Sequence, residues 1–355
     1  VQTADRRSSD IYKDMDKSKA RIYDDLMARH WDYWDEGSYR HIFVGELADG
    51  KASEGVDILG PEAAWDAPLA PYFDMAEIAW NNAGTRLAYT CKPLTGMRYA
   101  VSTDSDIFVY DLASGTTQNI CKPDSVNYPG GLTIQSNELP GYDKYPVWSP
   151  DDRYIAFLSQ RRAGNESDKA RLFLYDTTTG AMTDLTTEFD YNAQNVVWED
   201  ASTLLFVAPI EATHQICRVR LTDEGHSPVE VLTRGDHDLT SFSTGGGRAV
   251  AERATISSAP EFFEVSLSDG SLTQISEINR DIYDHIRMGE VQKRWVKTTD
   301  GKQMLTWVIL PPDFDPAKKY PVLLYCEGGP QSVVSNGWSL SLIHISEPTR
   351  LRRIS

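Results

Sequence analysis

The chain has 355 residues, a formal net charge of −17 and 41% hydrophobic residues. This length allows two domains and a large core. The acidic balance argues against nucleic acid or an anionic membrane as a partner. There is no run of 18 apolar residues, so the sequence predicts no transmembrane helix. Four widely spaced cysteines without a Cys-x-x-Cys pair argue against a zinc ribbon or a disulfide framework.

The first part of the chain gives one weak helical signal. Residues 19–31 carry Ile22, Leu26 and Met27 among charged residues, which is the spacing of one amphipathic helix. We therefore expect residues 1–39 to form an N-terminal helical segment followed by part of a β-sheet unit. After this segment the pattern changes to short strands and turns.

A strand–turn–strand pattern recurs three times, in residues 78–89, 146–157 and 196–206. Each copy has a short strand ending in tryptophan (Trp80, Trp148 and Trp198), then a polar turn and an apolar strand. We expect the tryptophans to pack in the core between repeats. The Ser-Pro-Asp-Asp turn of the second copy suits a type I turn with proline at its second position.

A second hairpin that turns at a glycine follows each of the three copies, and two further hairpins of this kind begin at His41 and Glu261. The five turn glycines, numbered 50, 115, 180, 225 and 270, are separated by 65, 65, 45 and 45 residues. A period near 45 residues with four strands per unit is the signature of a β-propeller blade. The longer intervals indicate loop insertions at residues 92–105 and 122–145. The sequence therefore predicts a mainly β protein with about five propeller blades in residues 40–276; an irregular β-sandwich, the alternative, does not explain the period.

The sequence after the blades has a different organisation. Residues 277–290 are a polar connector, and residues 293–312 are typical of a hairpin around Asp300-Gly301. Residues 320–325 form an apolar run after a loop, which indicates a fully buried strand. Glu327, Gly328, Gly329 and Pro330 follow it as a sharp loop whose backbone N–H groups can face a ligand.

The blades and residues 291–332 together resemble the prolyl oligopeptidase family of serine peptidases, in particular bacterial dipeptidyl peptidases of the type-five kind and acylaminoacyl peptidases. The resemblance implies a propeller that filters substrates by size for an α/β-hydrolase domain, which would begin at residues 291–339. It implies short peptide substrates, no cofactor and a periplasmic or secreted location. A TolB-like propeller that binds proteins without catalysis is the alternative; residues 291–330 argue against it, because a binding propeller does not need them. An esterase of the same architecture stays open.

Within this resemblance, residues 327–329 match the loop that supplies one oxyanion donor. Gly328 matches the position whose backbone N–H stabilises the oxyanion. The family commonly has His or Tyr where this chain has Glu327. An ionised carboxylate beside a developing oxyanion is unfavourable. Glu327 must therefore point away, be protonated or bind a substrate amine, or else it is a structural loop residue with an ion-pair partner elsewhere.

The catalytic residues of such an enzyme are not found in the sequence. The 355 residues contain no Gly-x-Ser-x-Gly, and no histidine belongs to a triad by motif. His237 lies between Asp236 and Asp238, but one histidine with two aspartates is weak evidence for a metal site. We expect a solvated loop between blades there and no metal ligand.

The end of the sequence has an unusual composition. Residues 340–350 resemble the translation of a transposase adapter used in DNA library preparation. We therefore expect residues 340–355 to be a non-native tail and the chain to be a truncated fragment of a serine exopeptidase. Such a fragment would be inactive, because the Ser-Asp-His triad would lie beyond it.

This interpretation predicts what the native gene encodes. We expect it to continue past the codon for Ser339 for on the order of 200 residues, the size of the rest of such a domain. Gly-x-Ser-x-Gly, then Asp, then His should follow in that order. Sequencing genomic DNA across this position tests the interpretation, and a stop codon next to the codon for Ser339 would contradict it.

Overall fold

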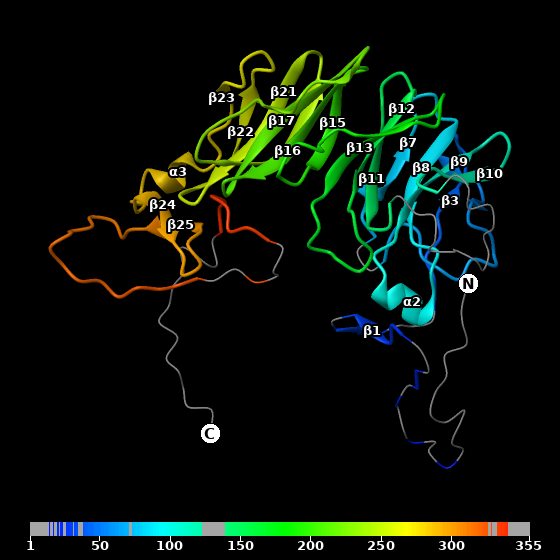
Figure 1. The fold of residues 1–355 in the computed structure, drawn as a ribbon, viewed down its shortest axis with the longest axis horizontal. Coiled ribbons are helices and arrows are strands. Elements are labelled where there is room, and N and C mark those ends of the chain that lie inside the picture. Colours follow the sequence, from blue (N-terminus) through cyan, green and yellow to red (C-terminus); the bar gives the residue numbers. More distant parts are fainter. Residues whose placement is uncertain are drawn as a thin grey trace. The chain divides into compact units, whose positions relative to one another are not determined.

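The computed structural model confirms the mainly β architecture and divides the chain into two compact units, Val1–Thr187 and Glu188–Ser355 (Figure 1). The described residues are 14, 17, 20, 22–23, 26–30, 32–34, 38–70, 73–122, 139–325, 328 and 332–339.

The N-terminal part of the first unit consists of three small hairpins and sheets. Strand β1 (Arg29–His30) pairs with β2 (Tyr33–Trp34), β3 (Phe43–Val44) with β6 (Val56–Asp57), and β4 (Leu47–Ala48) with β5 (Lys51–Ala52). The prediction of a helix over residues 19–31 is wrong at its described end, because residues 29–30 form β1. The apolar spacing there was weak, and pairing with β2 satisfies the backbone instead.

Two four-stranded antiparallel blades complete the first unit (Figure 1). The first blade consists of strands β7 (Ile78–Trp80), β8 (Arg86–Cys91), β9 (Asp106–Asp111) and β10 (Thr116–Asn119). The second consists of strands β11 (Asp143–Trp148), β12 (Tyr154–Ser159), β13 (Arg171–Asp176) and β14 (Met182–Asp184). The short helix η1 (Met75–Glu77) precedes β7. Helix α2 (Gly96–Val101) follows β8 and lies within the first predicted insertion. Residues 123–138 of the second insertion lie outside the described residues.

The second unit contains two more blades. The first of them consists of strands β15 (Gln194–Asp200), β16 (Thr203–Ile210), β17 (Thr213–Thr222) and β19 (Glu230–Val231), with β18 (Gly225–His226) pairing at the end of β17. The other consists of strands β20 (Asp238–Gly245), β21 (Arg248–Thr255), β22 (Ser258–Val265) and β23 (Leu272–Gln274). One parallel pair, His214 with Asp238, joins β17 to β20.

The blade turns follow the predicted chemistry. All five turn glycines have a positive φ between 66° and 131°, a region that costs glycine little. In the Ser-Pro-Asp-Asp turn, Asp152 N donates to Ser149 O at 2.9 Å, which closes the four-residue turn around Pro150. The same Asp152 carboxylate accepts hydrogen bonds from Asn82 N at 2.7 Å and Ala83 N at 2.9 Å, and so connects the turns of two successive blades.

The core lies between successive sheets. In the first unit Ile107, Trp148, Ile155 and Phe157 pack between the two blades, and in the second Leu205, Ile216 and Leu239 do so. Trp148 and Trp198 are buried, as predicted for the repeated tryptophans.

The same prediction is wrong for Trp80, which is 47% exposed. Because side chains alternate along a strand, Trp80 lies on the same face of β7 as Ile78, which packs toward Ile42 and Ile58. The short strands that contribute this layer do not cover Trp80 as a complete blade covers Trp148.

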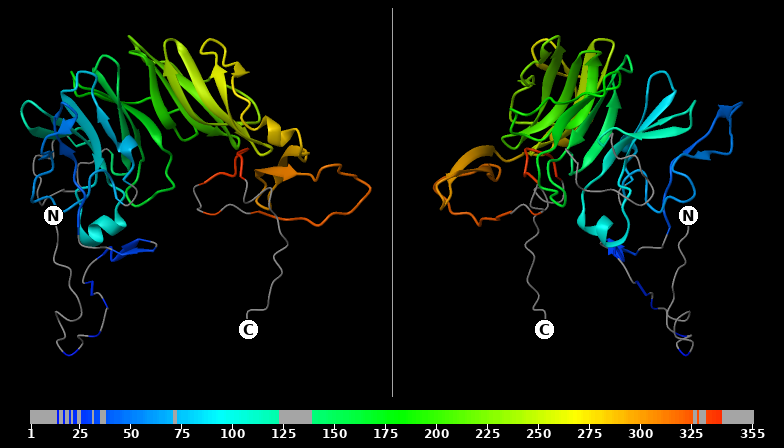
Figure 2. Two further views of the ribbon diagram at one scale, coloured as in Figure 1. Left: turned by 180° about the vertical axis from the view of Figure 1, so that it is seen from behind. Right: turned by 45° about the vertical axis from the view of Figure 1, so that its right-hand side comes forward.

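A connector and a hairpin follow the blades in the second unit (Figure 2). The connector contains helix α3 (Arg280–Tyr283), and β24 (Val291–Lys297) pairs with β25 (Gln303–Ile309) around Gly301, as the Asp-Gly turn predicts. None of the described helices is long and apolar enough to cross a membrane.

The buried strand predicted at residues 320–325 is absent. The segment is not part of a sheet, and Val322, Leu323 and Leu324 are 80–90% exposed. No strand among the described residues lies beside it to accept its hydrogen bonds. An apolar run can become a buried strand only where neighbouring strands exist, so its sequence pattern alone does not form one.

The core packing predicts that replacing two phenylalanines of the second unit by alanine lowers its stability by very different amounts. Phe206 in β16 is fully buried, whereas Phe262 in β22 is 42% exposed. We expect Phe206→Ala to lower the free energy of unfolding of this unit by about 3–5 kcal/mol through lost burial and a cavity. The matched control Phe262→Ala should cost less than about 1 kcal/mol. Urea unfolding curves measure both, and equal losses would contradict the described burial.

Candidate functional site

The predicted oxyanion loop lies at the border of the described residues. Glu327 and Gly329 lie outside them, and Gly328 is described. Gly328 is exposed, and a Cβ atom added there would meet no atom within 4 Å. A side chain would therefore fit at this position, and the role of the Gly328 N–H as an oxyanion donor stays a prediction.

The segment after this loop, residues 332–339, contacts the blades of its own unit through Asn336. The Asn336 side chain accepts a hydrogen bond from Ile256 N at 2.9 Å and donates to Asp236 O at 2.8 Å. Its backbone N–H donates to Ala212 O at 3.0 Å. Asn336 is 4% exposed, so these three bonds replace water and fix the segment on loops of the two blades.

Asp238 provides a second contact for the same segment. Its Oδ2 accepts a hydrogen bond from Ser335 Oγ at 2.5 Å, and its Oδ1 accepts one from His214 N at 3.0 Å. His214 Nδ1 lies 3.2 Å from Asp238 Oδ1. These are the residue types of a catalytic triad, but here the aspartate lies between the serine and the histidine. In a triad the histidine contacts the serine and takes its proton, so this group anchors the segment and does not activate a nucleophile.

Sequence reasoning missed Ser335, Asn336 and His214. Ser335 and Asn336 are about 100 residues from their partners in the chain. Nothing in their local pattern marks them as contacts.

The structure corrects the prediction that His237 lies in a solvated loop. His237 is only 4% exposed, and its Nε2 has no hydrogen-bond partner among the described residues. Burial, together with the Arg253 guanidinium, lowers the pKa of His237 to about 4, although Asp238 and Asp236 act in the opposite direction. The imidazole is therefore neutral at physiological pH. The loop turns inward because Gly235, at φ +143°, allows close contact with the ring.

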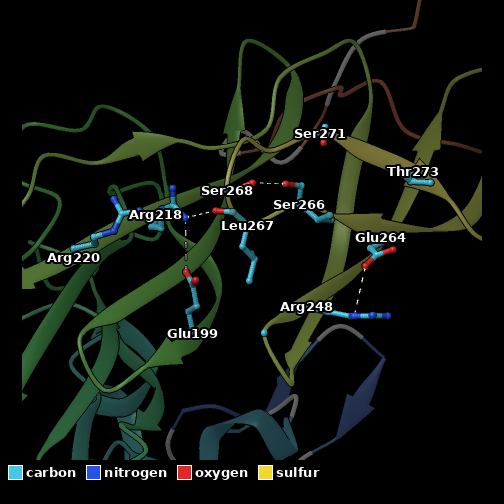
Figure 3. Close-up of a pocket in the computed structure, with 12 residues that line it drawn as sticks. Glu199, Arg218, Arg220, Arg248, Glu264, Ser266, Leu267, Ser268, Ser271 and Thr273 are labelled. Carbon is cyan, nitrogen blue, oxygen red and sulfur yellow. Dashed lines mark hydrogen bonds and ion pairs between the residues drawn. The ribbon is translucent and has the colours of Figure 1, made fainter.

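A hollow of about 610 Å³ lies between the two blades of the second unit (Figure 3). Three arginines line it, and each has a carboxylate partner. Arg218 and Arg220 lie 3.0 and 3.2 Å from Glu230, and Arg248 lies 3.9 Å from Glu264. Because these charges are already paired, the lining indicates ion pairs that hold β17, β19, β21 and β22, and not an anion site.

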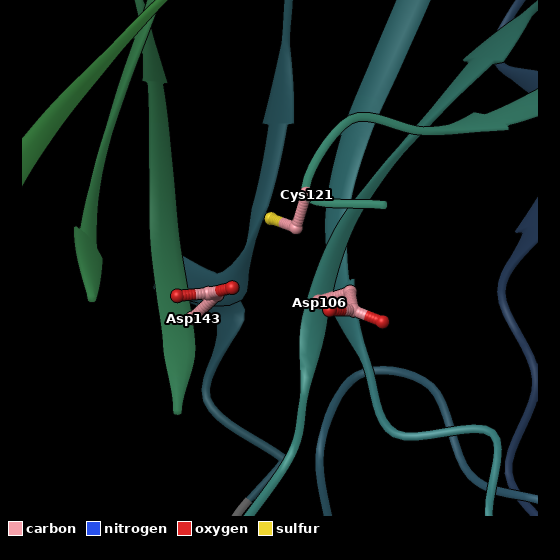
Figure 4. A group of neighbouring side chains, drawn as sticks. All are labelled: Asp106, Cys121 and Asp143. Carbon is pink, nitrogen blue, oxygen red and sulfur yellow. The ribbon is translucent and has the colours of Figure 1, made fainter. Parts of the chain in front are cut away.

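A buried group of three side chains lies between the two blades of the first unit (Figure 4). Asp106 begins β9, Cys121 follows β10 and Asp143 begins β11. Their ligand atoms all lie within 4.8 Å of one another. Burial raises the pKa of Asp106 to about 6, and burial also raises the pKa values of the Cys121 thiol and the Asp143 carboxyl well above their usual range.

Comparison with known proteins adds the evidence for a family. No family model matches the chain. The chain is 39% identical over 335 residues to dipeptidyl-peptidase 5 of Porphyromonas gingivalis, covering 94% of this chain and 46% of that protein. It is 37% identical over 344 residues to dipeptidyl-peptidase 5 of Porphyromonas endodontalis, covering 96% and 47%. The resemblance to the prolyl oligopeptidase family is confirmed. The chain spans about half the length of the curated relatives it matches.

A solved structure supports the fold. An acylaminoacyl peptidase in complex with Z-Gly-Gly-Phe-chloromethyl ketone matches 75% of this chain and 48% of its own, with a TM-score of 0.50 and 16% identity. At this identity the likeness concerns the fold alone. It agrees with the four-stranded blades described above and with the predicted propeller class.

The burial of His237 predicts a pH-dependent stability. An unfolded histidine has a pKa near 6.5, and that of folded His237 is about 4, so between these values the unfolded chain binds more protons. Stability must therefore fall as the pH drops from 6.5 to 4. Relative to His237→Gln, we expect the wild type to lose about 3 kcal/mol between pH 7 and pH 4. Urea unfolding of both proteins at both pH values measures this, and equal pH dependence would contradict it.

Proposed function

We propose that this chain is the propeller and the beginning of the peptidase domain of a serine exopeptidase. The enzyme would release dipeptides or acyl-amino acids from short peptides. The observation that carries the proposal is the 39% identity to a protein named dipeptidyl-peptidase 5 across 335 residues. The β24–β25 hairpin and the Gly328 loop after the blades support it, because a propeller that only binds proteins does not need them.

Each predicted region then has a role. Residues 40–276 form the propeller, which admits short peptides and excludes folded chains, after the N-terminal segment 1–39. Residues 277–290 connect it to residues 291–339, the start of the hydrolase domain, and residues 340–355 are a non-native tail. Residues 340–355 lie outside the described residues.

The chemistry we propose for the whole enzyme is acyl transfer to a serine. A histidine oriented by an aspartate takes the serine proton as the hydroxyl attacks the peptide carbonyl. The Gly328 N–H then donates to the oxyanion of the tetrahedral intermediate, an interaction of about 3 kcal/mol in comparable sites. Gly329 belongs to the same predicted oxyanion loop and lies outside the described residues. For a dipeptide-releasing enzyme we propose that Glu327 binds the free amine of the substrate, where its negative charge is paired; an acylated substrate has no such amine, and Glu327 must then point away from the oxyanion or be protonated.

The 355 residues alone would not catalyse this reaction. They contain no Gly-x-Ser-x-Gly. The described residues bring one serine, one aspartate and one histidine together at Asp238, and there the serine does not contact the histidine as a base would require.

The proposal predicts activity for the product of the complete native gene and none for this chain. We expect the complete product to cleave chromogenic dipeptide substrates, and a serine-directed phosphonate to abolish the cleavage. This chain, assayed at the same concentration, should give no more than the background rate.

Two controls separate the alternatives. N-acylated substrates and simple esters, assayed in parallel, distinguish a dipeptidyl peptidase from an acylaminoacyl peptidase or an esterase. A complete product that cleaves none of these substrates would contradict the proposed enzyme and favour a binding propeller. Phosphonate-sensitive turnover by this chain would contradict its predicted inactivity.

A further inference from the structure

The group of Asp106, Cys121 and Asp143 has a position and a composition that the proposed peptidase does not use. Asp106 and Asp143 are 0% exposed, and Cys121 is 6% exposed. Asp106 and Cys121 belong to the first blade and Asp143 to the second, so the group bridges two sheets. Figure 4 shows the Cys121 sulfur and the Asp143 carboxyl turned toward each other, with Asp106 beside them.

Asp143 lacks the partners that a buried carboxyl normally has. By hydrogen-bond geometry neither of its oxygens has a partner among the described residues, although the Ser159 hydroxyl and the Cys121 thiol lie close enough to lower its pKa against the larger effect of burial. Buried polar side chains are nearly always hydrogen-bonded, and an exception calls for an explanation such as a bound ion. Asp143 is also fully enclosed and lies against two other potential ligands, so an ion there would meet three donor atoms at once.

The charges around the group are unbalanced. Lys122 Nζ lies 2.9 Å from Asp104 Oδ1 and 2.6 Å from Asp106 Oδ1, so one ammonium serves two carboxylates. Asp143 adds a third carboxyl without an ammonium of its own in the described residues. An uncompensated buried carboxylate costs several kcal/mol, so Asp143 must either hold a proton or face a cation.

We propose that Asp106, Cys121 and Asp143 form a binding site for a divalent, thiophilic metal ion of the zinc class. A thiolate with two carboxylate oxygens is a donor set that Zn²⁺ accepts, with a fourth position left for another ligand. Ca²⁺ and Mg²⁺ fit poorly, because they prefer six or more oxygen ligands and no sulfur. Binding releases the protons of the Cys121 thiol and the Asp143 carboxyl, and the ion replaces them as the positive partner.

An ion bound at this site would link the two blades of the first unit. Because the ligands come from both sheets and the unfolded chain does not hold them together, the binding free energy adds to the stability of the first unit.

Metal titration of the 355-residue chain tests the proposal. After EDTA treatment and dialysis, Co²⁺ serves as a spectroscopic probe and Zn²⁺ as the competing ion. We expect one Co²⁺ per chain with a thiolate-to-cobalt charge-transfer band, which Zn²⁺ removes, and a higher melting temperature with Zn²⁺ than with Mg²⁺. A wild-type chain that shows no band and no Zn²⁺-specific thermal shift would overturn the proposal whatever the variants do.

Three variants locate the site. Cys121→Ser should abolish the band, and Asp143→Asn, which has the shape of the protonated carboxyl, should weaken Co²⁺ binding at least tenfold while leaving the metal-free protein folded. The matched control is Cys217→Ser, a buried cysteine of the second unit, which should bind as the wild type does. A band that survives Cys121→Ser, or that Cys217→Ser removes, would place the metal elsewhere and overturn the proposal.

Discussion

The structure depends on the apolar face that each four-stranded sheet presents to the next. In the first unit the side chains of Ile107, Ile155 and Phe157 fill the space between two blades and are fully buried. At about 25 cal/mol per Å² of buried apolar surface, such faces supply most of the stabilisation, since a single sheet cannot bury its own faces. Trp148 adds a directional contact to this packing, since its Nε1 donates a hydrogen bond to Ala79 O of the preceding blade at 3.1 Å.

Because the sheets pack closely, a charged group between them is shielded from water and needs a partner of opposite charge. Glu77, 1% exposed, pairs with Lys144 at 2.9 Å, although burial still raises the pKa of Glu77. Lys122 compensates Asp104 and Asp106 in the same way. Asp143 lacks this compensation, and it lies beside the one buried thiol that follows β10. Asp143 therefore differs from these two ion-paired groups, and this difference is the reason for assigning a cation there.

In the second unit, the blades also hold the sequence that follows the proposed oxyanion loop. Residues before this loop belong to the β24–β25 hairpin, whose Lys293 pairs with Glu211 at 2.8 Å. Residues after it are fixed by Asn336 and by the hydrogen bond of Ser335 to Asp238. Residues 332–339 are thus held on the blade loops of their own unit.

The sequence by itself determined the features that depend on local chemistry and on repetition. The Gly-turn period predicted the blades, because each blade is built from neighbouring strands whose turns need a positive φ or an Asp-Gly pair. The same local chemistry predicted the hairpin at Asp300-Gly301 and the likeness to the peptidase family.

Only the tertiary structure decided the features that depend on what lies beside a residue. Trp80 and Trp148 have the same local pattern, yet only Trp148 faces a complete neighbouring blade. The apolar run 320–325 is exposed because no strand lies beside it, and His237 is buried because its loop turns onto Gly235. The ligand group of Asp106, Cys121 and Asp143 and the anchor at Asn336 join residues far apart in the chain, with Asn336 and Ala212 separated by 124 positions (336 − 212). Such contacts leave no periodic trace in the sequence, since the packing of separate strands and loops sets them.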